Sequence, residues 1–309
     1  MKTICQTRLP AELHSRGKVR DNYIGMDGTF ILVTTYRISA FDRVLPQQIP
    51  GKGQCLNESS RYTFENSRDI VPNHYLASPH PNVMVAQRCE PVELEVIARG
   101  YLSGSAWRTY EKGQRRFFGG VTLTEGLKKN QNLVDVLGRP ILTPTTKAKT
   151  GHDEYIDDRA VADEVARGRW DEIEDAAFRL FARANEMAGR NGYSEADTKY
   201  EFGLRDGKLF LIDEANTHDS SRFFRKATYG VQFQLGKDLD WIDKEYVRIY
   251  LTGLGWTGDG PVPDLPSEIV EGAQRRLLES VKAITGRDFV PVEPREEEMI
   301  EALRSGGYV

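Results

Sequence analysis

The chain has 309 residues, of which 39% are hydrophobic and 28% charged, and its formal net charge is -4. A chain of this length can bury a sizeable core, so one large domain with two lobes, or two domains, is expected. The balanced charge argues against nucleic acid as the main partner, and no apolar run reaches membrane-spanning length. Three scattered cysteines predict free thiols in a reducing cytoplasm.

The first part of the chain predicts strands joined by polar loops. Residues 13–35 have the pattern of a β-meander. Within it, Lys18 and Arg20 lie on one face of a strand after Gly17, which makes this turn a candidate phosphate cradle. An ordinary turn explains the same residues. Residues 37–43, which include Asp42, follow a strand end as a binding loop would.

Further elements are predicted in chain order. Glycines and serines precede a helix at 106–112, where free backbone amides near Arg99 and Ser105 could hold an anion, although a structural cap is an equal alternative. Prolines make the segment 139–148 extended. Strands are expected at 82–86 and 92–97, and helices at 56–66, 171–190, 243–251, 267–284 and 296–303.

Two predicted strands, 195–203 and 209–214, form a hairpin around an Asp-Gly pair. They carry the charged residues Asp197, Lys199, Glu201, Asp213 and Glu214. Burying charges is costly unless they are paired, so a mostly buried hairpin with five of them indicates a site.

The register of the hairpin decides which carboxylates cooperate. A two-residue turn would place Glu201 and Asp213 on opposite faces, whereas a three-residue loop over 205–207, with Gly207 left-handed, places them on one face. We expect the three-residue loop. The two carboxylates would then suit Mg²⁺, which completes its shell with water and phosphate oxygens. Charges solvated at a sheet edge are the alternative.

Six motifs occur in one order along the chain. They are Gly17-Lys-Val-Arg-Asp21, Arg37-Ile-Ser-Ala-Phe-Asp42, Arg99-Gly-Tyr-Leu-Ser-Gly-Ser-Ala-Trp107, Thr143-Pro-Thr-Thr-Lys147 with His152-Asp-Glu154, Asp197-Thr-Lys-Tyr-Glu-Phe-Gly203 and Asp219-Ser-Ser-Arg-Phe223. With them, nearly the whole chain resembles the phosphoribosylaminoimidazole-succinocarboxamide synthase (SAICAR synthetase) family of purine biosynthesis.

The resemblance implies an α+β, two-lobed fold, with an antiparallel N-terminal lobe at 1–90, a larger C-terminal lobe at 91–309, and ATP between them. It implies an ATP-dependent ligase that activates the carboxylate of carboxyaminoimidazole ribonucleotide, as an acyl phosphate, for attack by the amine of L-aspartate. The implied cofactors are ATP and Mg²⁺. The implied partners are these small molecules, without nucleic acid or membrane, and the oligomeric state is left open.

The resemblance also assigns residues. It implies ATP binding by Lys18, Arg20, Lys147, Glu201 and Asp213, of which Glu201 and Asp213 hold the metal. It implies substrate binding by Asp42, Arg99, Ser105, Ser221 and Arg222. Asp197 and Lys199 match polar positions on the catalytic strand.

The chain departs from the family pattern at Tyr36, Asn22, Glu195 and the segment Ala215-Asn-Thr-His218. These departures leave open a specialised-metabolism paralogue that joins an amino acid to a related heteroaromatic carboxylate, such as a pyrazole, by the same chemistry. Two alternatives come from other classes. A small-molecule kinase would need His-Arg-Asp and Asp-Phe-Gly motifs, which the chain lacks. A nucleotide sensor would not need both candidate metal carboxylates.

Overall fold

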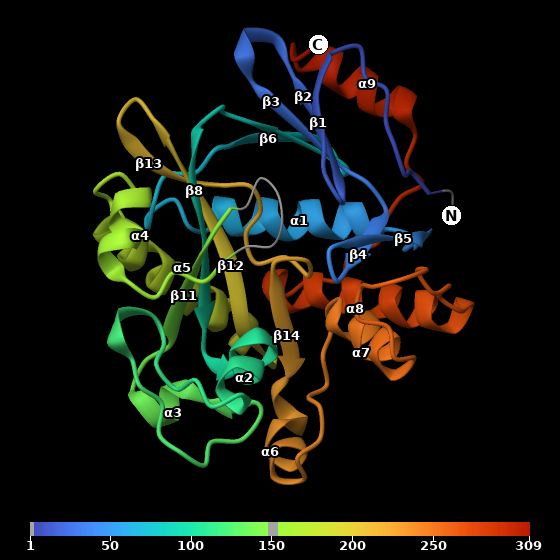
Figure 1. Ribbon diagram of the computed structural model, residues 1–309. Coiled ribbons are helices and arrows are strands. Elements are labelled where there is room, and N and C mark those ends of the chain that lie inside the picture. Colours follow the sequence, from blue (N-terminus) through green and yellow to red (C-terminus); the bar gives the residue numbers. More distant parts are fainter. Residues whose placement is uncertain (1–2, 148–153) are drawn as a thin grey trace.

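Two antiparallel five-stranded sheets organise the chain, and helices lie beside and between them (Figure 1). The structure is a computed structural model that describes residues 3–147 and 154–309. His152 and Asp153, which belong to one of the motifs, lie outside the described residues.

The first sheet has the strand order β1-β2-β3-β7-β6. Its strands are β1 (Glu12–Arg16), β2 (Arg20–Ile24), β3 (Phe30–Thr34), β6 (Tyr75–His80) and β7 (Val83–Ala86), with a short 3-10 turn, η1 (Met26–Gly28), between β2 and β3. The predicted meander is therefore confirmed. Ile31, Val33 and Val85 pack against Met299 and Leu303 of the last helix, α9 (Glu296–Ser305). The end of the chain thus returns to the first sheet (Figure 1).

A small hairpin of β4 (Arg37–Ala40) and β5 (Arg43–Gln48) leads into helix α1 (Lys52–Glu65). The helix begins earlier than the predicted residue 56 because Gly51 adopts a left-handed conformation, with φ 79°, at its N-cap. The next glycine, Gly53, lies against the backbone of β3, since a Cβ there would be 2.5 Å from the Thr34 carbonyl oxygen. The start of α1 therefore lies in close contact with the first sheet.

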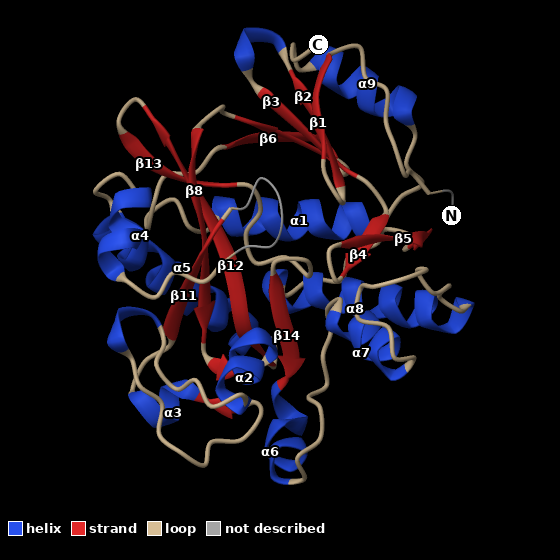
Figure 2. Cartoon of the chain, in the orientation of Figure 1, coloured by secondary structure: helices blue, strands red, loops and turns tan. Residues whose placement is uncertain are grey.

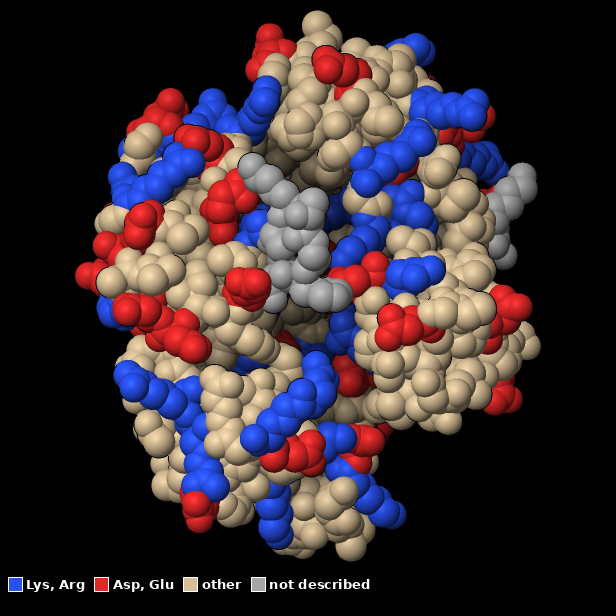
Figure 3. Space-filling view, in the orientation of Figure 1, with Lys and Arg blue, Asp and Glu red and all other residues tan. Residues whose placement is uncertain are grey.

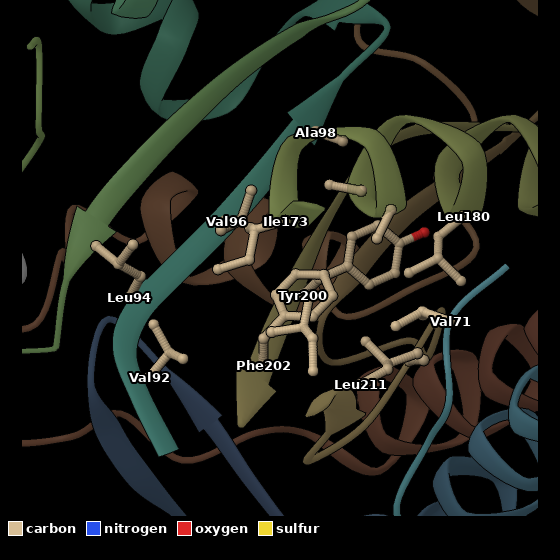
Figure 4. Close-up of a cluster of buried hydrophobic side chains, with 14 of the residues drawn as sticks. Val71, Val92, Leu94, Val96, Ala98, Ile173, Leu180, Tyr200, Phe202 and Leu211 are labelled. Atoms are coloured by element: carbon tan, nitrogen blue, oxygen red, sulfur yellow. The ribbon is translucent and has the colours of Figure 1, made fainter. Parts of the chain in front are cut away.

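The second sheet has the order β11-β8-β12-β13, and β14 pairs with β12. Its strands are β8 (Glu90–Arg99), β11 (Ile141–Thr146), β12 (Tyr193–Arg205), β13 (Lys208–Ile212) and β14 (Ser221–Arg225). Helix α5 (Trp170–Arg190) packs on one face. Tyr200 and Phe202 of β12 enter the core there with Ile173 and Leu180 of α5 (Figure 4). Because side chains alternate along a strand, the charged residues of β12 face the other side.

The hairpin register corrects our expectation. Arg205 pairs with Lys208, so the turn contains only Asp206 and Gly207, with φ of 50° and 72°. The predicted three-residue loop is wrong. A two-residue turn with positive φ at both positions matches the twist of the strands, and Asp-Gly is a sequence that favours it.

The remaining elements surround this framework (Figure 2). They are β9 (Tyr101–Leu102), β10 (Gln131–Asn132), η2 (Phe118–Gly120), α2 (Gly104–Glu111), α3 (Leu133–Leu137), α4 (Arg159–Val165), α6 (Lys226–Gln234), α7 (Glu245–Gly253) and α8 (Ser267–Thr285). The predicted helices are confirmed apart from shifts at their ends, whereas α3, α4 and α6 were not predicted. Within the described residues, none of the helices has the length and apolar character needed to cross a membrane.

The chain has the α+β, two-lobed fold expected for it. β8 begins at Glu90, where the lobe boundary was predicted, and that boundary stays a prediction. Since α9 packs on the first sheet, we propose that the smaller lobe also contains residues 296–309.

Candidate active site

Strand β12 presents three charged residues in succession on the face away from α5. They are Asp197, Lys199 and Glu201, all with their side chains largely out of solvent. β12 is central because it pairs with β8, β13 and β14, so residues from all three neighbours reach this row. The row connects two clusters, one at each end.

The first cluster surrounds Glu201. The Lys199 ammonium donates to Glu95 of β8 at 2.7 Å and to one Glu201 oxygen at 2.6 Å. Lys147 donates to the other Glu201 oxygen. Burial opposes ionisation of this carboxyl, but the two ammonium groups prevail and lower the pKa of Glu201 to about 2. Glu201 is therefore an anion at neutral pH.

Asp213 joins this cluster although the hairpin register argues against it. The β12–β13 ladder ends at the Glu201–Ile212 pair, so Asp213 lies just beyond the alternation of the strand. Its backbone is left-handed, with φ 67°, and Arg20 bonds both its carbonyl oxygen and its carboxylate. Asp213 also acts electrostatically on Lys147 and Lys199, the partners of Glu201. The two carboxylates thus share one cationic environment, for a different reason from the one we predicted.

A divalent cation fits this donor set. Mg²⁺ prefers oxygen ligands and commonly takes only one or two carboxylates, with phosphate oxygens and water as its other ligands. Glu201 and Asp213 supply such a pair. Among the described residues, no group of three or more acidic, histidine or cysteine side chains is placed to hold a metal ion. A metal here would therefore depend on ligands from a bound phosphate.

The second cluster lines a cavity of about 150 Å³. Its walls include Ile97, Arg99, Ser105, Asp197, Lys199, Asp219, Ser220, Ser221, Arg222, Lys244 and Arg248. Figure 3 shows this side of the molecule, where Lys and Arg side chains gather around a central hollow. An excess of cations over carboxylates along the walls suits an anionic ligand such as a phosphate.

Two arginines of this cavity are held in place by Asp197. Arg222 donates to both oxygens of Asp197, with 2.9 Å from Nε to Oδ1, and Arg99 approaches the same carboxylate at 3.6 Å. Arg99 also donates to Thr143 Oγ1 at 2.8 Å and Ser105 Oγ at 2.9 Å. Such bonds fix the plane of each guanidinium and prepare it for a tetrahedral or planar anion.

A third group of charges, on the far wall, was not assigned from the sequence. Asp219 lies between Lys52 of α1, at 2.5 Å, and Lys244, at 3.9 Å. Burial opposes ionisation, but these two ammonium groups hold the pKa of Asp219 well below its usual range. The glycines around Lys52 were a signal in the sequence, but its pairing with a residue 167 positions away was not visible.

Two predicted residues lie outside both the cavity walls and the cluster around Glu201. Lys18, assigned to ATP, forms an exposed ion pair with Asp42, assigned to the substrate. Neither belongs to the cavity walls. Ser221, in contrast, lies in the wall as expected, and its hydroxyl is 2.7 Å from that of Thr198.

The departures from the family pattern are mostly hidden. Tyr36 and His218 have 0% exposure, and neither lines the cavity. Asn22 donates to Ser15 on the neighbouring strand. Glu195 and Asn216 are buried and bond each other.

Comparison with known proteins gives consistent matches. The SAICAR synthetase family model matches residues 13–262. Curated relatives are the phosphoribosylaminoimidazole-succinocarboxamide synthases of Bacteroides fragilis, 43% identical over 89% of this chain and 87% of that protein, and of Azobacteroides pseudotrichonymphae, 40% identical over 93% and 87%. The structure of SAICAR synthase from Saccharomyces cerevisiae complexed with SAICAR superposes with a TM-score of 0.79 at 31% identity, covering 93% of this chain and 99% of that one. This chain therefore belongs to the SAICAR synthetase family.

Proposed function

We propose that this protein is an ATP-dependent ligase that forms SAICAR from carboxyaminoimidazole ribonucleotide and L-aspartate. The observation that carries the proposal is the row on β12, which joins an arginine-lined cavity to the Glu201–Asp213 pair through Lys199. The cavity offers a place for a ribonucleotide phosphate, and the pair a place for the phosphates of ATP.

The residues divide into roles along this row. Arg99, Arg222 and Ser105 bind the ribonucleotide phosphate, with Ser221 beside them. Arg20 and Lys147 bind the phosphates of ATP, together with Lys18 from the first sheet. Lys199 lies between the two groups, so its ammonium can stabilise the charge that develops during transfer. Asp42 is paired with Lys18, so we assign it to orienting that ammonium and no longer to direct contact with the substrate.

The chemistry follows from the poor leaving-group character of a carboxylate oxygen. An oxygen of the substrate carboxylate attacks the γ-phosphorus of ATP, the bond to the bridging oxygen breaks, and ADP leaves. The aspartate amine then attacks the acyl carbon of the acyl phosphate, loses a proton, and expels inorganic phosphate. Placing the reactants in line supplies much of the rate enhancement. Bound Mg²⁺, held by Glu201 and Asp213, would neutralise phosphate charge.

The paralogue alternative is not favoured. It rested on residues that flank the substrate loops, and Tyr36 and His218 both point into the protein instead of the cavity. The curated relatives cited above also carry the name of the purine enzyme. We further propose a cytoplasmic location, supported by the three free cysteines Cys5, Cys55 and Cys89.

The test is substrate-dependent release of phosphate. The protein is incubated with ATP, Mg²⁺ and carboxyaminoimidazole ribonucleotide, with and without L-aspartate, and products are identified by mass. We expect SAICAR, ADP and phosphate in equal amounts, and only when all substrates are present. Efficient turnover of a pyrazole carboxylate in place of the ribonucleotide would overturn the proposal, as would transfer of phosphate to a hydroxyl.

A further inference from the structure

A buried carboxyl lies behind the substrate cavity and has no part in the chemistry described above. Glu195 is on β12 next to a bulge, where the pairing with β14 shifts between Glu195 and Asp197. Its side chain has 0% exposure, and its backbone N–H donates to Asn185 of α5 at 3.1 Å. The bulge turns Glu195 toward the interior, while Asp197 faces the cavity.

The side chain of Glu195 bonds the first residue of a loop segment, Asn216. Asn216 donates from Nδ2 to both carboxyl oxygens, at 2.9 and 3.0 Å, and to the Tyr200 hydroxyl at 3.0 Å. The hydroxyl of Ser221 lies 2.7 Å from that of Thr198, and both hydroxyls lower the pKa of the Glu195 carboxyl against the larger effect of burial. Asn216 and Ser221 begin and end a segment that we call the 216–221 turn. Glu195 thus holds the first end of this turn directly, through the side chain of Asn216.

The 216–221 turn is tightly bonded within itself. Ser221 N–H donates to the Thr217 carbonyl at 2.8 Å, and Asp219 N–H donates to the Thr217 hydroxyl at 3.1 Å. The Ser220 carbonyl accepts from Lys199 N–H at 3.0 Å. Such a unit moves as one body, and its placement depends on the groups that hold it, which are Glu195 at its start, the Lys199 backbone, and Lys52 at Asp219. Its outer residues, from Asp219 to Ser221, form part of the cavity wall.

We propose that Glu195 is a positioning residue that holds the start of the 216–221 turn through Asn216 and thereby helps to place Asp219 and Ser220 in the cavity wall. The left-handed backbone of Asn216, with φ 52°, fits this role because asparagine tolerates that conformation while its side chain reaches Glu195. Glu195 does not touch the cavity, and it acts only through the turn.

The test begins with the ligand-free protein, by amide hydrogen exchange of the turn. Glu195→Ala should accelerate exchange across 217–221 by about tenfold or more, because the Asn216 end is released. Glu195→Gln should restore slow exchange, since an amide can accept from Asn216 Nδ2 and can donate to Asn216 Oδ1, which has no partner in the described part of the chain. Asn216→Gly keeps the left-handed backbone and deletes only the side chain, so it should behave as Glu195→Ala does.

The second readout is kinetic, and it rests on the proposed function. Glu195→Ala should raise KM for the carboxylate ribonucleotide about tenfold and leave KM for ATP within about twofold, with Glu195→Gln close to the starting enzyme. The matched control is Leu277→Ala in the core of α8, which lowers stability without touching the turn. Unchanged exchange in both Glu195→Ala and Asn216→Gly would overturn the proposal, as would equal increases in the two KM values. If the starting protein makes no SAICAR, the proposed function fails, and the exchange experiment still decides the role of Glu195.

Discussion

Asp197 illustrates, at the scale of one residue, how a carboxylate can organise a site for anions. Both of its oxygens accept from Arg222, and Arg99 lies close to one of them. The sequence placed Asp197 on the catalytic strand, and the contacts indicate a narrower role. We propose that Asp197 positions the two guanidinium groups and does not itself take part in bond making.

Replacing Arg222 by lysine tests the arginine cluster. An ammonium cannot reproduce the two parallel bonds to Asp197, so Arg222→Lys should raise KM for the ribonucleotide by about tenfold or more, with KM for ATP nearly unchanged. Initial rates with each substrate varied in turn provide the measurement. Arg225→Lys on the same strand is the control, because its partners are Asp240 and Glu279 instead of the cavity residues. Equal effects on both KM values would show that Arg222 supports the whole site.

Glu195 contributes one part of the pH dependence of stability, beside other buried carboxyls such as Glu214 and Asp243, whose pKa values burial also raises. Burial raises the pKa of Glu195 from the ordinary 4.5 to about 8, so the folded protein holds this proton between those two values while the unfolded chain has lost it. The stability contributed by Glu195 is therefore complete below pH 4.5 and is lost as the pH rises toward 8.

Glu195→Gln removes this titration and keeps a neutral polar group. The free energy of unfolding of the variant, relative to that of the starting protein, should rise between about pH 5 and pH 8 by an amount on the order of a few kcal/mol. Urea denaturation at intervals across this range measures the difference. A constant difference would show that Glu195 is ionised in the folded state at every pH tested.

Among the elements, α2 is placed by a close contact with the arginine cluster. Gly104 is its first residue and has a φ of 53°, and a Cβ there would lie 1.9 Å from Arg222 Nη1. The guanidinium therefore lies directly on the backbone at the start of the helix. Only glycine allows this approach, and the approach brings the first amides of α2 near the cavity.

Gly104→Ala should displace Arg222 and raise KM for the ribonucleotide by at least about tenfold, because bidentate contacts depend on the position of the guanidinium. Gly138→Ala at the end of α3 is the matched control. Its φ is 76° and a Cβ there meets nothing within 4 Å, so it shares the backbone strain without the collision. If the two variants have the same kinetic effect, strain alone explains the result.

At the scale of the whole molecule, the buried Lys52–Asp219 pair links parts that are far apart in the chain. Lys52 begins α1, which packs on the first sheet, and Asp219 belongs to the 216–221 turn of the second. The Lys52 side chain has 0% exposure. Removing Lys52 takes the nearer of two ammonium groups from a buried carboxylate, and Lys244, at 3.9 Å, compensates that charge only in part. This loss is far more costly than that of a surface pair.

Lys52→Met should lower the free energy of unfolding by about 3–5 kcal/mol. The control, Lys282→Met, removes one member of the exposed Lys282–Asp288 pair and should cost less than about 1 kcal/mol. Both values come from chemical denaturation at neutral pH. Adding Asp219→Asn to Lys52→Met should restore part of the stability, and a further loss in the double variant would contradict the pairing.

The sequence by itself determined the local elements, and it predicted the charged residues at each end of the candidate site. The apolar run within 29–35 predicted β3, the helical spacing of apolar residues at 171–190 predicted α5, and the Asp-Gly pair predicted the hairpin, because each signal depends on neighbours within a few residues. The motifs were sufficient for the family, and they singled out Arg99 and Arg222, which the structure brings together in one cavity wall.

Only the tertiary structure decided how distant residues combine. The alternation of side chains along a strand could not predict the position of the Asp213 side chain. The ladder ends at Ile212, and the backbone of Asp213 is left-handed, with its carbonyl oxygen bonded by Arg20. The pairing of Lys52 with Asp219, and of Glu195 with Asn216, joins residues whose separation carries no local signal. Helix α9 likewise covers the first sheet from the far end of the chain. These contacts form because a buried charge is costly unless it is paired and an apolar face is stabilised by burial, whichever part of the chain supplies the partner.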